Sequence, residues 1–224
     1  MSRPAERPRK RGSPRSLPVV GLVVEGDTEY EALPLLHKMK LVPCCPPLKA
    51  SNIRGLGANM SPRAIAQAVC QQVVAHIVAG RSRVLVCLDR EDRDDCPGDL
   101  AKAIEKELEA ELRNTSIGQK KRPHEVSVVI ANRAFEAWIL ADAGGLHARQ
   151  IFRRAPSFHC FEGQMGKRRQ MGVVEIRELW EREYRKTTDG PRLFEKLRFS
   201  DARKCGKGQR GSKSLDKLLR CLGV

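Results

Sequence analysis

The segment Val19-Val20-Gly21-Leu22-Val23-Val24-Glu25-Gly26-Asp27-Thr28-Glu29 decides the fold class. Its apolar run ends abruptly in a charged turn, which is typical of a strand that helices cover on both faces. Largely apolar runs recur at Val84–Leu88 and Val126–Ala131, and stretches of helical spacing separate them. Strands that alternate with helices imply a parallel sheet. The sequence therefore predicts an α/β fold, with a parallel sheet flanked by helices.

Helices are predicted from the 3.6-residue spacing of apolar positions and from their start signals. Ser61-Pro62 has the form of a capping residue followed by a proline in the first turn. The predicted helices are Thr28–Met39, Ser61 to Gly80, Pro97–Leu112, Ala134–Ala141, Val173–Arg185, Pro191–Leu197 and Ser212–Cys221. Trp138 is expected in the core and Asp142 as a cap for the turn that follows it.

The composition divides the chain into three parts. Residues 1–17 hold six arginines and lysines and one acid among prolines and serines. Such a segment buries too little apolar surface to offset its ordering entropy, so we expect a mobile basic tail. Residues 18–145 contain all the predicted strands. Residues 146–224 are basic and predicted to be mainly helical.

The net charge of +15 on 224 residues favours a polyanionic partner, and nucleic acid leads that class. Aromatic residues make up only 4% of the chain, which argues against a binder that stacks single-stranded bases. Candidate backbone contacts are Arg54, Lys167, Arg168, Arg169, Lys204, Lys207 and Arg210. No apolar stretch approaches the ~20 residues of a membrane span. Eight cysteines without a CxxC pair favour a reducing cytoplasm.

Acidic residues cluster where two predicted strands end. Glu25 and Glu29 bracket the first turn, while Asp89 and Glu91 follow the second strand. Parallel strands end at one edge of a sheet, so the two clusters should meet there. Four converging carboxylates repel unless a cation joins them, and oxygen ligands suit Mg²⁺ or Mn²⁺. Each acid taken alone fits a solvated loop better than a metal site, and Glu29 also fits a favourable interaction with a helix N-terminus. Taken together at one edge of the sheet, the acids favour the metal site.

These motifs resemble the TOPRIM domain of topoisomerases, primases and overcoming-lysogenisation-defect nucleases. The likeness lies in Val23-Val24-Glu25-Gly26-Asp27-Thr28-Glu29 and in Val84–Leu88 followed by Asp89-Arg90-Glu91. Phe135-Glu136-Ala137-Trp138 and Tyr184-Arg185-Lys186-Thr187-Thr188-Asp189-Gly190 resemble a small TOPRIM family whose members occur near phage-defence ATPases. The resemblance implies that residues 18–145 are a TOPRIM-like catalytic domain, which residues 146–224 complete.

The resemblance also implies a nuclease that cuts phosphodiester bonds with Mg²⁺ or Mn²⁺, in an antiviral defence role, with an ATPase as companion. The implied catalytic residues are Glu25, Asp89 and Lys186, the last to neutralise the scissile phosphate. The implied metal ligands are Glu25, Glu29, Asp89, Glu91 and Glu136. Alternatively, Lys186 is an ordinary solvated lysine and Glu136 a carboxylate on a helix surface.

One departure from the family pattern keeps other functions open. The usual Asp-x-Asp is Asp89-Arg90-Glu91 here, so the second carboxylate is either Glu91 or Asp92. A degenerate site would make the chain a non-catalytic nucleic-acid-binding module, or an interaction subunit docked on an ATPase. The sequence leaves open DNA or RNA as substrate, one metal or two, and whether the chain forms a homo-oligomer.

Overall fold

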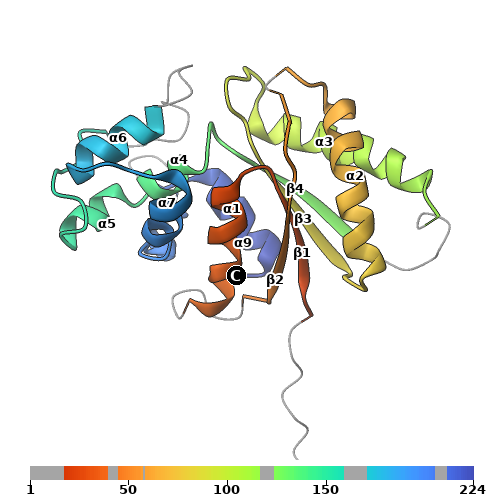
Figure 1. Ribbon diagram of the computed structural model, residues 1–224, viewed down its shortest axis with the longest axis horizontal. Coiled ribbons are helices and arrows are strands. Elements are labelled where there is room, and N and C mark those ends of the chain that lie inside the picture. The colour runs from red at the N-terminus through yellow and green to blue at the C-terminus, as the bar shows by residue number, and fades with distance from the viewer. Residues whose placement is uncertain (1–17, 40–44, 58, 117–123, 159–170, 205–210) are drawn as a thin grey trace, which may run out of the picture.

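A computed structural model describes residues 18–39, 45–57, 59–116, 124–158, 171–204 and 211–224 (Figure 1). Within these residues four strands form one sheet: β1 (Val20–Val24), β2 (Leu48–Asn52), β3 (Arg83–Asp89) and β4 (Glu125–Ala131). The strand order is β2-β1-β3-β4 and every pairing is parallel. The predicted α/β fold with a parallel sheet flanked by helices is confirmed. The predicted tail, residues 1–17, lies outside the described residues.

Two long helices, α2 (Pro62–Val78) and α3 (Pro97–Arg113), cover one face of the sheet (Figure 1). Ser61 caps α2 as predicted, because its hydroxyl accepts the Ala64 N–H at 3.2 Å. Alternate strand residues such as Val23, Val86 and Ile130 pack against the apolar sides of these helices. This alternation is what a strand buried on both faces requires.

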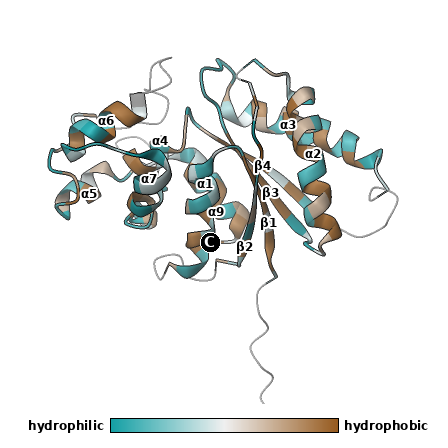
Figure 2. Cartoon of the chain, in the orientation of Figure 1, coloured by the Kyte–Doolittle hydropathy of each residue, from teal (hydrophilic) through white to brown (hydrophobic). Residues whose placement is uncertain are grey.

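The other face carries the remaining helices (Figure 1): α1 (Asp27–Ala32), the 3₁₀ helix η1 (Leu33–Lys38), α4 (Glu136–Leu140), α5 (Ala143–Ala148), α6 (Met171–Trp180), α7 (Lys186–Phe194), α8 (Phe199–Ala202) and α9 (Lys213–Leu222). Trp138 is fully buried there, as expected, among Phe135 and Phe194. Figure 2 shows the hydrophobic residues running along the central strands β1 and β3. Helices of residues 146–224 thus share one core with the sheet.

Three helix predictions miss the observed bounds. The helix predicted over Thr28–Met39 changes to 3₁₀ after Ala32, because Pro34 has no N–H for the α-helical bond. The helix predicted to reach Arg185 ends at Trp180, followed by Glu181 with φ of 57° in the left-handed region. The helix predicted from Pro191 begins five residues earlier, at Lys186. Strand β2 and helices α5 and α8 were not predicted.

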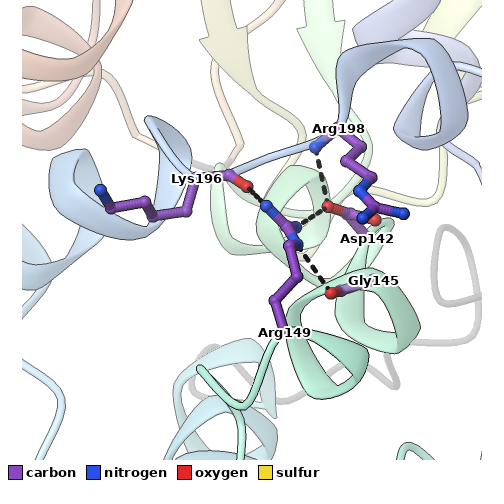
Figure 3. Close-up of polar contacts among 5 residues, drawn as sticks. All are labelled: Asp142, Gly145, Arg149, Lys196 and Arg198. Atoms are coloured by element: carbon purple, nitrogen blue, oxygen red, sulfur yellow. Dashed lines mark hydrogen bonds and ion pairs between the residues drawn. The ribbon is translucent and has the colours of Figure 1, made fainter.

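Asp142 ties the helices of this second layer together instead of capping α5 (Figure 3). Its buried carboxylate accepts a hydrogen bond from Arg149 at 2.7 Å and the Arg198 N–H at 2.8 Å. Arg149 also donates to the carbonyls of Gly145 and Lys196. The network joins α5 to the chain that follows α7. Within the described residues, no helix is long and apolar enough to cross a membrane.

Candidate active site

Glu25 and Asp89 lie side by side at the carboxyl edge of the sheet. Glu25 directly follows β1, and Asp89 is the last residue of β3. These two strands are adjacent and parallel, and their register pairs Val24 with Cys87. The Asp89 backbone N–H donates to Glu25 Oε2 at 3.4 Å. Two carboxylates that are 64 residues apart in the sequence therefore meet where the sequence predicted.

Two further carboxylates, Glu29 and Glu136, are buried at the same edge. Glu29 belongs to the first turn of α1 and is 5% exposed, and Glu136 opens α4 just after β4 and is 2% exposed. Gly26 makes room for Glu29, since a Cβ at this position would stand 2.2 Å from Glu29 Oε2. The burial of Glu136 excludes the alternative of a carboxylate on a helix surface.

The four acids interact electrostatically. Burial raises the pKa of Asp89 well above its usual value, and repulsion from Glu29, Glu136 and Glu25 raises it further. Burial, reinforced by Glu136 and Glu25, raises the pKa of Glu29 to about 7. Both shifts mean that ionising these carboxyl groups in the folded protein costs free energy. Perturbed carboxylates of this kind are characteristic of functional sites.

Lys186 and Tyr184 reach the cluster from the start of α7 and from the loop before it. The Tyr184 hydroxyl donates to Glu136 Oε1 at 3.4 Å, and Lys186 Nζ lies 3.4 Å from the same oxygen. Tyr184 is buried, whereas the Lys186 side chain is 49% exposed. Asp189 fixes this loop because its carboxylate accepts the Arg185 N–H at 2.9 Å. Lys186 is thus in an ion pair with the acidic cluster.

An open cleft of about 510 Å³ borders the cluster on the β1 and β2 side. Its walls include Glu25 and Asp89, together with Asp27, Asn52, Arg54 and Glu91. Arg54 is 83% exposed at its side chain and lies 3.5 Å from Asp27. Glu91 reaches the cleft with φ of 51°, in the left-handed region of backbone conformation. Asp92 is not among the residues that line this cleft.

The donor chemistry of the cluster fits a hard divalent cation, since all four buried or half-buried groups offer carboxylate oxygens. Across the part of the chain that the structure describes, however, no three histidine, cysteine, aspartate or glutamate side chains are grouped to hold a metal. The contacts give a reason: Glu25 turns to the Asp89 N–H, and Glu136 turns to Tyr184 and Lys186. Ligation would require these side chains to rotate toward a common centre.

The predicted nucleic-acid contacts are only partly placed. Arg54 lies at the cleft, while Lys204 forms an ion pair with Asp201 at 3.2 Å and is not among the residues lining the cleft. Lys167, Arg168, Arg169, Lys207 and Arg210 lie outside the described residues.

Sequence reasoning assigned no role to Tyr184 or Asn52. Tyr184 stood inside a quoted motif, where its place next to Lys186 was the available signal. Asn52 ends a strand that the apolar pattern did not reveal.

The chain was compared with protein-family models, curated proteins and solved structures, and none of the three comparisons gave a match.

Proposed function

We propose that this protein is a nuclease of TOPRIM type that cleaves nucleic-acid phosphodiester bonds with Mg²⁺ or Mn²⁺. The observation that carries the proposal is the convergence of Glu25, Glu29, Asp89 and Glu136 from three separate chain segments. Burying mutually repelling carboxylates destabilises the fold unless a cation joins them. The motif resemblance, which rests on the same residues, supports the same assignment.

The chain's own residues have distinct roles in this proposal. Glu25, Glu29, Asp89, Glu91 and Glu136 provide the oxygen ligands, of which Glu25 and Asp89 adjoin the cleft and the buried cluster alike. A bound divalent ion would polarise the phosphate and make a water molecule more acidic. Arg54 at the rim of the cleft binds a neighbouring backbone phosphate, and Lys186 neutralises the phosphate that is cut.

The proposed substrate rests on the net charge, and the proposed cellular role rests on the family resemblance. The net charge of +15 favours nucleic acid as the substrate. The likeness to TOPRIM proteins near phage-defence ATPases supports a role in antiviral defence in the cytoplasm, with such an ATPase as companion.

The test is cleavage of plasmid DNA and of RNA by the purified protein with Mg²⁺, Mn²⁺ or EDTA. Activity should appear with metal and disappear with EDTA, and the two substrates separate a DNase from an RNase. Glu25→Ala and Asp89→Ala should abolish cleavage, whereas Asp92→Ala on the same loop serves as the control and should be mild. An active Glu25→Ala protein would place the chemistry elsewhere and overturn the proposal.

Metal binding is tested separately through thermal stability. Mg²⁺ or Mn²⁺ should raise the melting temperature of the wild type by mass action on the folded state. Glu25→Ala and Asp89→Ala should lose this shift and keep a folded, metal-free protein, because each removes a repelling charge. Nucleic-acid binding without a metal shift and without cleavage would identify a non-catalytic binding module instead.

A further inference from the structure

Lys186 is the cation that the acidic cluster already contains. Its Nζ lies 3.4 Å from Glu136 Oε1, the oxygen that also accepts the Tyr184 hydroxyl. Its positive charge lowers the pKa of both Asp89 and Glu29, opposing the effects of burial and of the other acids. One ammonium group therefore offsets part of a charge that four carboxylates share.

This arrangement bears on the role given to Lys186 above. An ammonium group in an ion pair with Glu136 cannot at the same time give its full charge to a phosphate. A divalent ion entering the cluster would need the same carboxylate oxygens and would repel the ammonium group. Because the Lys186 side chain is 49% exposed and begins α7, it can swing toward solvent without disturbing the core.

We propose that Lys186 is a built-in counter-ion which competes with the divalent metal for Glu136, so that metal loading releases its ammonium group toward the substrate phosphate. This inference rests on the proposed function. Tyr184 is the positioning residue of the arrangement: it is buried, and its hydroxyl holds Glu136 in place when Lys186 leaves. The Lys186 ammonium group is then free to contact the substrate phosphate only when the metal is bound.

The test measures metal affinity, not catalysis. Mn²⁺ is titrated into wild type, Lys186→Met and Lys186→Arg by calorimetry, without nucleic acid. Lys186→Met removes the competitor and should bind Mn²⁺ at least about threefold more tightly, the scale of a partly exposed ion pair. Lys186→Arg retains a cation and should stay close to the wild type.

Two controls make the result specific. Lys106→Met removes the same charge from an exposed position on α3, on the opposite face of the sheet, and should leave the affinity unchanged. In a Glu136→Gln background, Lys186→Met should lose its effect, since the shared oxygen has lost its charge.

Unchanged or weaker Mn²⁺ binding by Lys186→Met would overturn the competition while leaving the proposed function intact. A wild type that binds no Mn²⁺ would instead overturn the proposed function, and this inference with it.

Discussion

The pKa of Glu29 shows most directly how the acidic cluster lowers the free energy of unfolding. Burial holds its pKa at about 7, against 4.5 for the free side chain, so the folded protein retains a proton that the unfolded chain releases. A raised pKa contributes stability below pH 4.5 that is lost as the pH rises to about 7. Asp89, with its pKa shifted the same way, adds to the effect.

We therefore expect the metal-free protein to lose stability between pH 5 and pH 7, by up to about 1.4 kcal/mol per pH unit from Glu29 alone. Urea unfolding in EDTA measures this for wild type and Glu29→Gln. The variant should show a clearly flatter profile over the same window. Equal slopes for the two proteins would mean that Glu29 is ionised in the fold.

Gly26 is required by the Glu29 carboxylate and not by its own backbone. Its φ of −112° suits alanine, yet a Cβ would stand 2.2 Å from Glu29 Oε2. Gly26→Ala should displace that carboxylate and weaken Mn²⁺ binding by about tenfold, as loss of ligand orientation does. Gly98→Ala is the control, because its Cβ would meet nothing closer than Cys96 Sγ at 3.9 Å. Calorimetry decides, and unchanged affinity in Gly26→Ala would remove Glu29 from the ligands.

At the scale of elements, the edge strand β4 is closed by two side chains. Glu105 of α3 accepts the Val128 N–H at 2.8 Å, and Lys217 of α9 donates to the Val128 carbonyl at 2.7 Å. These groups face outward from the sheet, where a free edge invites pairing with another chain. The ion pair between Glu105 and Lys217, at 3.8 Å, completes the closure.

Replacing both side chains by alanine should leave the Val128 groups unpaired and lower the free energy of unfolding by about 1–3 kcal/mol. The exposed edge should also raise the average mass in light scattering as concentration increases. Glu109→Ala on the same helix is the control, since Glu109 is exposed and pairs only with Arg113 among the contacts seen for it. If the double variant has the average mass and the free energy of unfolding of the wild type, Glu105 and Lys217 do not protect the edge strand.

The elements that were predicted correctly are those whose own residues show an apolar pattern, because they are buried. Strands β1, β3 and β4 are apolar because helices cover both of their faces. Strand β2 (Leu48–Asn52) pairs with β1 at the edge of the sheet and is only half buried, so it carries Lys49 and Asn52 and no apolar pattern. Helix α7 was placed too late because Pro191, a usual start signal, stands in its interior.

For the molecule as a whole, the meeting of Glu25 and Asp89 could be predicted because strand ends of a parallel sheet fall at one edge. The burial of the acidic cluster could not be predicted from the sequence. Glu136 and Tyr184 are buried in a core that helices α6 to α9 share with the sheet, a long-range packing that no local pattern encodes. The same packing sets Lys186 against Glu136, and the sequence did not predict this ion pair.

The net charge of +15 is also a property of the whole molecule, and it predicts how binding should depend on salt. Phosphate contacts release counter-ions, so affinity should fall by orders of magnitude between ~50 and ~200 mM salt if several contacts form. Fluorescence anisotropy with Asp89→Ala protein measures binding without cleavage. Arg54→Gln, at the rim of the cleft, should reduce the slope of log K against log salt by about one.

Arg63→Gln is the matched control for this titration, because Arg63 is similarly exposed but lies on α2 and pairs with Glu111. It should leave the slope unchanged. A flat titration would contradict a polyanionic partner altogether, since a charge-driven complex must lose affinity as salt replaces the released ions. A steep slope that Arg54→Gln does not reduce would retain the nucleic acid but move its backbone away from the cleft, and with it the phosphate that Lys186 is proposed to meet.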